Sequence, residues 1–327
     1  MRRPKLPLVI MSHTLPDDWI APLQGHCELQ VGPVDATHLH ANLEQYLPEA
    51  DGALVLLTIP INDAFLNRAP KLRVISNMAV GVDNIDLAAC TRRGIPVGNT
   101  PGVLTEGTAD LTMALLLAAA RNLPQASLDA REGRWKTWSP AGWLGADLSG
   151  ATLGIIGMGK IGRAVAKRAR GFEMRVVYSD TTRAADDDAE YLPLDDLLAQ
   201  SDFVSLHIPL TPQTRHLINA AALRRMKPSA ILINAARGPI VDTEALYQAL
   251  SQGWIAQAAL DVTNPEPLPT DHPLYTLPNC LILPHIGSAT RNTRRRMAEL
   301  ACANLLAGLA GQPLPHCVNP EVYAPHA

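Results

Sequence analysis

Three residues suited to acid–base and anion chemistry lie in the second half of the sequence, each just after a short apolar segment. They are Arg237, Glu266 and His285. Histidine can give or take a proton near neutral pH, and a carboxylate bonded to it, such as Glu266, would favour its protonated form. Arginine offers a planar fork of donors that can bind a carboxylate and polarise the carbonyl beside it. The set therefore predicts proton transfer at the carbonyl of a small acid.

A glycine-rich segment earlier in the chain could hold a phosphate. Residues 154–162 read GIIGMGKIG, directly after an apolar segment and directly before a helical one. In such a turn Gly157 permits the bend, Gly159 lets the backbone approach a pyrophosphate, and Gly162 lets the helix pack closely. The helix N-terminus supplies amides for the anion. The residues that we assign to this dinucleotide site are Gly157, Gly159, Lys160, Ile161 and Gly162.

The acid after the next predicted strand bears on which dinucleotide binds. Asp180 follows Gly162 by 18 positions, close to the roughly 20 expected for a carboxylate that binds the adenosine ribose hydroxyls. A carboxylate would repel a 2′-phosphate, which favours NAD(H). Arg183 lies three residues further on and could turn toward such a phosphate, so NADP(H) stays open.

Short apolar segments alternate with helical stretches along most of the chain, which predicts parallel sheets covered by helices on both faces. The fold class is α/β, with two Rossmann-like/flavodoxin-like parallel-sheet domains. The second strand series is long enough for a six-stranded doubly wound sheet. The predicted strands are 6–11, 28–31, 53–57, 73–77 and 96–99 in the first series, and 152–156, 175–179, 203–207, 230–234, 256–260 and 280–283 in the second.

Two helical segments decide the domain organisation. The largely apolar stretch 105–122 predicts a buried helix, wedged between domains or between subunits. A last helix near 290–311 comes after the second sheet is complete, so we expect it to return to the first domain and make that domain discontinuous. Residues 1–99 plus 289–327 would then form the substrate domain, and 100–288 the NAD-binding Rossmann domain.

Composition excludes several classes of function. The chain has 28 Lys and Arg against 31 Asp and Glu, so its net charge of −3 offers no global field for nucleic acid or anionic lipid. The longest apolar run, 113–120, is far short of the roughly 18 residues needed to cross a bilayer. The histidines show no metal-ligand spacing. The five scattered cysteines suit a reducing compartment, the cytoplasm by default. The acidic run 186–188 reads as a solvated loop.

Several motifs resemble the D-isomer-specific 2-hydroxyacid dehydrogenase family, over nearly the whole chain. They are VGVDNID at 80–86, NTPG at 99–102, TAD at 108–110, HIPLT at 207–211, RGPIVD at 237–242, NPEP at 264–267 and PHIGS at 284–288. Within the family, TPGVLT at 100–105 and GRWKTW at 133–138 look most like glyoxylate/hydroxypyruvate reductases. The resemblance implies NAD(P)H-dependent reduction of a small 2-oxo acid, glyoxylate or hydroxypyruvate, to the D-2-hydroxy acid.

The resemblance also implies roles for individual residues. His285 and Glu266 would be the proton donor pair, and Arg237 would bind the substrate carboxylate. The backbone amides at Val80 and Gly81 would hold the other side of that carboxylate. Asp261 would bind the nicotinamide carboxamide, and His207 and Pro209 would lie near the adenosine. The positions that we assign to the cofactor beyond the glycine-rich turn and Asp180 are Thr108, His207, Pro209, Thr214, Ala235, Asp261 and Gly287.

Some of these positions have a plainer interpretation. His207 could simply pack at a strand end. Trp138 could be surface packing, or it could reach into the substrate pocket of a partner subunit, as its counterpart does in similar reductases. The apolar helix at 105–122 and the segment with Trp135 and Trp138 together predict a homodimer. The arginines between 291 and 296 read as a solvated or interface face.

Alternatives to the leading function remain open. Val82 stands where a tyrosine is common in the family, and 77–79 replaces a stretch that often carries an aromatic, so another substrate such as 2-ketogluconate is possible. Formate dehydrogenases of this type carry glutamine in place of the acid, so Glu266 weighs against formate; phosphite oxidation is less clearly excluded. A corepressor that senses NAD and binds proteins could keep all three site residues. Turnover of 2-oxo acids separates these functions.

Overall fold

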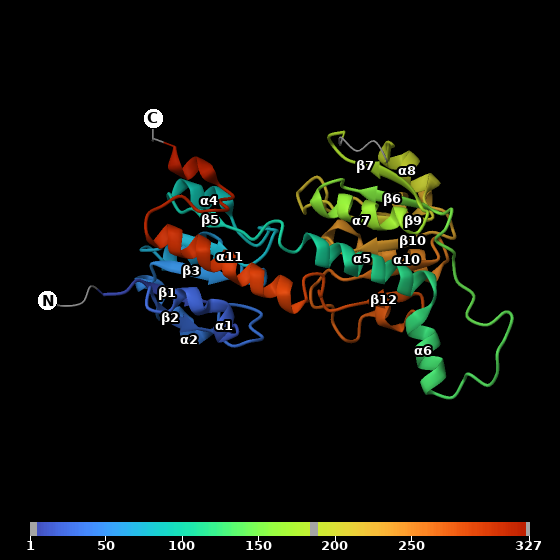
Figure 1. Cartoon of the computed structure of the whole chain (residues 1–327), viewed down its shortest axis with the longest axis horizontal. Helices are drawn as coiled ribbons and strands as arrows, with labels where there is room; N and C mark the ends of the chain where they lie inside the picture. Colours follow the sequence, from blue (N-terminus) through green and yellow to red (C-terminus); the bar gives the residue numbers. More distant parts are fainter. Residues whose placement is uncertain (1–4, 184–188, 325–327) are drawn as a thin grey trace. The chain divides into compact units, whose positions relative to one another are not determined.

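The chain folds into two compact units, residues 1–104 with 290–327 and residues 105–289. We call them the first and the second unit (Figure 1). The computed structural model describes residues 5–183 and 189–324, so the acidic run 186–188 lies outside the described residues. Within the described ranges, no helix is both long and apolar enough to cross a bilayer.

The first unit is built on a five-stranded parallel sheet. Its strands are β1 (Leu8–Met11), β2 (Glu28–Val31), β3 (Gly52–Val55), β4 (Val74–Asn77) and β5 (Val97–Gly98). They lie in the order β2-β1-β3-β4-β5, which is the flavodoxin-like order. All five predicted strands are present, each within two residues of its predicted ends.

Helices cover both faces of this sheet. They are α1 (Asp17–Ile20), α2 (Ala41–Glu44), α3 (Asp63–Arg68), α4 (Leu87–Arg92) and α11 (Arg291–Leu309). Helix α11 packs on β3 and β4, and the Ser76 hydroxyl of β4 donates to the Ala301 carbonyl of α11 at 2.8 Å. Alternate strand residues, Ala53, Val55 and Ile75, share a buried cluster with side chains of α2, α3 and α4. The chain therefore returns to its first unit through α11, and this unit is made of two separate stretches of the chain.

The second unit is built on a seven-stranded parallel sheet. Its strands are β6 (Thr152–Ile156), β7 (Arg175–Ser179), β8 (Glu190–Tyr191), β9 (Phe203–Leu206), β10 (Ile231–Asn234), β11 (Gln257–Leu260) and β12 (Cys280–Ile282). The order β12-β11-β10-β9-β6-β7-β8 starts in the middle and winds outward in both directions, as in dinucleotide-binding sheets.

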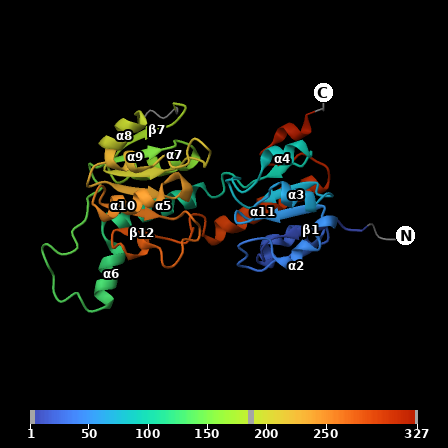
Figure 2. The same cartoon turned by 180° about the vertical axis from the view of Figure 1, so that it is seen from behind.

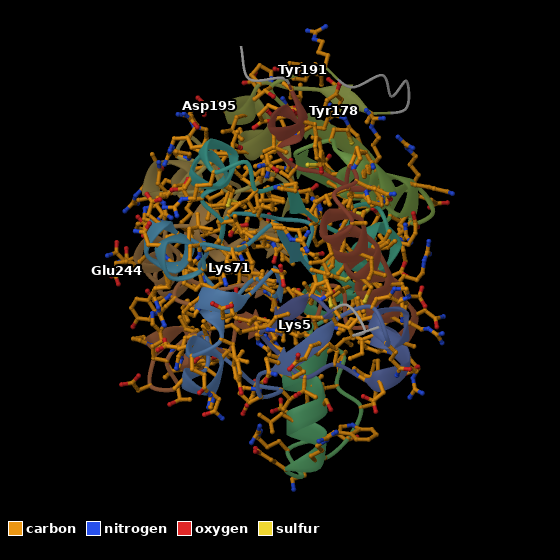
Figure 3. The ribbon with its side chains drawn as sticks, turned by 90° about the vertical axis from the view of Figure 1, so that its left-hand side faces the viewer. Lys5, Lys71, Tyr178, Tyr191, Asp195 and Glu244 are labelled. Carbon is orange, nitrogen blue, oxygen red and sulfur yellow. The ribbon has the colours of Figure 1, made fainter. Side chains whose placement is uncertain are left out.

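The sequence analysis predicted six strands here and missed β8. This strand has only two residues, too few to show a hydrophobic pattern. It pairs with Val177 and Tyr178 of β7, and the rings of Tyr178 and Tyr191 meet edge to face with centroids 5.5 Å apart. Figure 3 labels both tyrosines. The edge strand thus depends on a tertiary contact that no local pattern reveals.

Helices cover the second sheet on both sides. They are α5 (Thr105–Ala120), α6 (Leu123–Arg131), α7 (Lys160–Arg170), α8 (Leu194–Gln200), α9 (Ala220–Arg225) and α10 (Thr243–Ser251). One buried cluster joins α5 and α7 to the sheet, and a second joins α8, α9 and α10 to it. Figures 1 and 2 show these two helix layers from opposite sides. Much of the apolar surface of α5 is buried within its own unit, whereas α6 has no buried residue.

Candidate active site

The ends of three neighbouring strands position the residues predicted to do chemistry. Strands β10, β11 and β12 pair in parallel, with Asn234 beside Leu260 and Leu260 beside Ile282. The loops that carry Arg237, Glu266 and His285 therefore start at the same level, at the carboxyl edge of the second sheet. Ligands of open α/β sheets bind at this edge.

His285 and Glu266 form a close pair. Nδ1 of His285 lies 2.5 Å from Oε1 of Glu266, and about a quarter to a third of each side chain is exposed, 27% and 33%. Oε2 of Glu266 accepts a hydrogen bond from the Thr263 amide at 3.3 Å, which fixes the carboxylate from the other side. Because Nδ1 is engaged by Glu266, Nε2 is the ring nitrogen that can exchange a proton with a ligand.

A buried aspartate holds the backbone of the His285 loop. Both carboxylate oxygens of Asp261 accept backbone amides, from Ile286 at 2.7 Å and from Gly287 at 2.8 Å. The carbonyl of Asp261 accepts the amide of His285 at 2.9 Å. Burial raises the pKa of Asp261, and the two amide hydrogen bonds oppose that rise. Sequence reasoning gave Asp261 a role in cofactor binding alone and missed this second role.

The Arg237 loop is held by the last residue of β10. The buried Asn234 side chain accepts from the Ala236 amide at 3.0 Å and donates to the Arg237 carbonyl at 2.9 Å. The partly buried Arg237 donates through Nη1 to the Ala236 carbonyl at 2.9 Å. The next residue, Gly238, packs so closely that a Cβ there would lie 1.8 Å from the Thr263 carbonyl oxygen. A polar residue that ends an otherwise apolar strand was the available signal for Asn234.

The glycine-rich turn fits a dinucleotide. Gly157 has φ of 97°, a conformation that other residues rarely adopt, and α7 begins three residues later at Lys160. A Cβ added at Gly159 would meet no protein atom within 4 Å. The space in front of Gly159 is therefore open to a ligand, as close approach of a pyrophosphate to the helix N-terminus requires.

Asp180 is tied to this same turn. Its Oδ2 accepts the Met158 amide at 2.8 Å, so its carboxylate lies beside the glycine-rich loop. The guanidinium of Arg183 lies 4.9 Å over the ring of Tyr191, at the outer edge of the sheet. The contact gives Arg183 a partner within the protein.

The remaining predicted cofactor positions lie in the second unit, in loops except for Thr108 on α5. Nε2 of His207 is 2.8 Å from the Ser205 hydroxyl, and burial lowers the pKa of His207 to about 4, so the ring is neutral near pH 7. The Thr214 hydroxyl donates to the Pro209 carbonyl at 2.7 Å, which closes the loop after β9. The Thr108 hydroxyl on α5 donates to the Gly287 carbonyl at 3.3 Å. Ala235 lies in the loop after β10 that Asn234 holds.

The other predicted substrate residues lie elsewhere. Val80 and Gly81 belong to the first unit, in the loop after β4. Trp138 lies in the segment after α6 with 80% of its surface exposed. Within residues 5–183 and 189–324 no group of three or more histidine, cysteine, aspartate or glutamate side chains is placed to hold a metal ion.

Comparison with known proteins gives a consistent result. The sequence profile of the D-isomer specific 2-hydroxyacid dehydrogenase NAD binding domain matches residues 113–287. A glyoxylate reductase of Korarchaeum cryptofilum is 48% identical over 97% of this chain and 97% of its own. The solved structure of the TT0316 protein of Thermus thermophilus has a TM-score of 0.90 at 50% identity and covers 95% of this chain and 99% of its own. The NADPH-dependent glyoxylate/hydroxypyruvate reductase of Sinorhizobium meliloti has a TM-score of 0.81 at 30% identity, with coverage of 96% and 98%.

Proposed function

We propose that this protein reduces glyoxylate or hydroxypyruvate. The premise is that the chain belongs to the D-isomer specific 2-hydroxyacid dehydrogenase family and is an NAD(P)-dependent oxidoreductase. The observation that carries this proposal is the 2.5 Å contact between His285 and Glu266, at the carboxyl edge of the sheet that also bears the glycine-rich turn. An acid–base pair and a dinucleotide turn on one sheet are what reduction of a carbonyl group requires.

The reduction divides among a few groups. NADH, held by the glycine-rich turn, would supply the hydride for the carbonyl carbon. Nε2 of His285 gives its proton to the carbonyl oxygen, and Glu266 stabilises the protonated ring before the transfer. Arg237 binds the substrate carboxylate and polarises the carbonyl oxygen. The product is the 2-hydroxy acid, of D configuration where the carbon is chiral.

The cofactor is NADH in preference to NADPH. Asp180 beside the glycine-rich turn would put a negative charge where a 2′-phosphate would lie, and the guanidinium of Arg183 is engaged with the Tyr191 ring. Gly157, Gly159, Lys160, Ile161 and Gly162 would hold the pyrophosphate. The remaining contacts would come from Thr108, His207, Pro209, Thr214, Ala235, Asp261 and Gly287.

The working form is a homodimer in the cytoplasm. Trp135 and Trp138 are 62% and 80% exposed, and with Trp143 they line an open hollow of about 310 Å³ beside α6. Exposed aromatic side chains gathered around a hollow are typical of protein interfaces. In a dimer Trp138 would reach the substrate pocket of the partner subunit. Sedimentation at micromolar concentration tests this, and a monomer would contradict it.

One experiment tests the proposed reaction. Initial rates are measured with NADH and with NADPH against glyoxylate, hydroxypyruvate, 2-ketogluconate, pyruvate and phenylpyruvate. We expect the highest kcat/KM for glyoxylate or hydroxypyruvate with NADH. A protein that binds NADH but reduces none of these acids would be a sensor of NAD and not a reductase.

A further inference from the structure

The loop after β4 is fastened by two asparagine side chains at adjacent carbonyl groups. Asn77, the last residue of β4, is fully buried and donates through Nδ2 to the Gly81 carbonyl at 3.0 Å. Asn99, directly after β5, donates through Nδ2 to the Val80 carbonyl at 2.8 Å. The two peptide planes on either side of Gly81 are therefore each held by one hydrogen bond.

These two bonds determine where the loop can donate. In a planar trans peptide the carbonyl and the following N–H point in opposite directions. The hydrogen bond from Asn99 to the Val80 carbonyl therefore turns the Gly81 N–H away from Asn99. The hydrogen bond from Asn77 to the Gly81 carbonyl likewise turns the Val82 N–H away from Asn77. Among the residues that the structure describes, none accepts a hydrogen bond from the N–H groups of Val80, Gly81 or Val82, and all three residues are partly exposed.

A wider frame holds the two asparagines themselves. Nδ2 of Asn77 also lies 3.2 Å from Oδ1 of Asn84, and Asn84 donates to the Ile59 carbonyl at 2.9 Å in the loop after β3. The Asn99 carbonyl accepts from Asn304 of α11 at 2.9 Å. Without such a frame Gly81 would be the most mobile point of the loop, because glycine has the widest range of backbone conformations.

Asn77 is not optimal for stability alone. Its Oδ1 is buried and has no hydrogen-bond partner among the described residues. An unpaired buried carbonyl is unfavourable, so a smaller side chain would avoid that penalty. A residue that carries a stability cost while it holds a loop with unused donors fits a functional role.

We propose that Asn77, together with Asn99, is a positioning residue for the substrate carboxylate. By holding the carbonyls of Gly81 and Val80, the two side chains preorganise the loop amides as donors to an anionic carboxylate, so that no energy is spent on ordering Gly81 when substrate binds. The inference rests on the proposed reduction of a 2-oxo acid, and on the assignment of the Val80 and Gly81 amides to its carboxylate that the family resemblance implies.

The test replaces Asn77 by serine, which is too short to reach the Gly81 carbonyl. We measure kcat and KM for glyoxylate, the inhibition constant of oxamate as a non-reacting carboxylate, NADH affinity by fluorescence, and Tm. We expect KM and the oxamate constant to rise together by about 5- to 10-fold, the effect of one neutral hydrogen bond. NADH affinity should stay the same, and Tm should fall no further than in the control variant described next. Asn77→Asp keeps the shape, loses the donor and adds a negative charge, so both constants should rise further.

Asn319→Ser is the matched control. Asn319 is also buried in the first unit and donates through Nδ2 to the Ile95 carbonyl at 3.1 Å, but none of its hydrogen bonds to the described residues reaches the loop after β4. This variant should lower Tm and leave KM and the oxamate constant unchanged. If Asn77→Ser changes the two constants no more than Asn319→Ser does, while the wild type reduces glyoxylate, the positioning role is wrong and the proposed function stands. A wild type that neither reduces any 2-oxo acid nor binds oxamate overturns both.

Discussion

The two units present different chemistry at the carboxyl edges of their parallel sheets. The edge of the first unit offers backbone N–H groups held by Asn77 and Asn99, neither of which can titrate. The edge of the second unit offers Arg237, Glu266 and His285. Holding an anion requires only fixed donors, whereas proton transfer requires a group that changes charge. Variants in the loop of the first unit should therefore change substrate binding, and variants in the second unit should change proton transfer.

His285→Ala should have the largest effect on the reaction. Loss of the proton donor should lower kcat for glyoxylate by roughly 10² to 10⁴ fold. NADH affinity, measured by fluorescence, should be nearly unchanged, because the proposal places His285 on the substrate and not on the dinucleotide. Wild-type rates in this variant would show that the chemistry is not located in the second unit.

Arg237→Ala should affect substrate binding and the chemical step together, because in the proposed function its guanidinium both binds the carboxylate and polarises the carbonyl oxygen. We expect kcat/KM for glyoxylate to fall by about 100-fold, with KM raised and kcat lowered, as for loss of a hydrogen bond to a charged group. Arg237→Lys keeps the charge but loses the planar fork, so it should recover only part of the loss. A change in KM alone would mean that Arg237, like the loop of the first unit, only binds the substrate. It would contradict a part for Arg237 in the chemical step.

Asp180→Ala should change cofactor preference without changing substrate preference. Removing the carboxylate removes its repulsion of a 2′-phosphate, so the ratio of kcat/KM for NADH to that for NADPH should fall by about tenfold. The KM for glyoxylate should stay the same. The assignment is wrong if NADPH is already preferred by the wild type and the variant leaves that preference unchanged.

His207→Asn should have the smallest effect, on acid stability of the second unit. Burial lowers the pKa of His207 to about 4 in the folded chain. The unfolded chain therefore binds more protons between about pH 6.5 and pH 4, so this residue lowers stability as pH falls through that window and has no such effect above it. Between about pH 6.5 and pH 4, the free energy of unfolding of the variant should fall by on the order of 1 to 3 kcal/mol less than that of the wild type.

Urea unfolding at several pH values measures this dependence. The same substitution at the exposed His26 of the first unit, His26→Asn, supplies the matched control. Equal pH dependence in the wild type and in His207→Asn would contradict the assignment.

The architecture could be predicted because its signals are local. Strands such as β6 and β7 are short apolar runs between turns, and the structure places both with their predicted bounds. The return of α11 to the first unit followed from the completed second sheet. Strand β8 could not be predicted, because it exists only through pairing with β7 and the contact between Tyr178 and Tyr191.

The sequence indicated the candidate titratable residues of the site but not the residues that hold them in place. Arg237, Glu266 and His285 stand out as polar side chains after apolar strands. Asn77, Asn234 and the second role of Asp261 depend on hydrogen bonds to backbone groups, which a sequence does not display. Their only signal is a polar residue at or just after the end of a buried strand. The roles of the titratable residues remain predictions until variants are measured.

The most direct test of the central claim is a double-mutant cycle on the pair in the second unit. Rates of glyoxylate reduction are measured for the wild type, Glu266→Gln, His285→Ala and the double variant. Glu266→Gln should lower kcat, because an amide makes a weaker hydrogen bond to His285 than the carboxylate that lies 2.5 Å from its Nδ1. If Glu266 acts through His285, the double variant should be no slower than His285→Ala alone. Fully additive losses, or a kcat that Glu266→Gln leaves unchanged, would contradict the account.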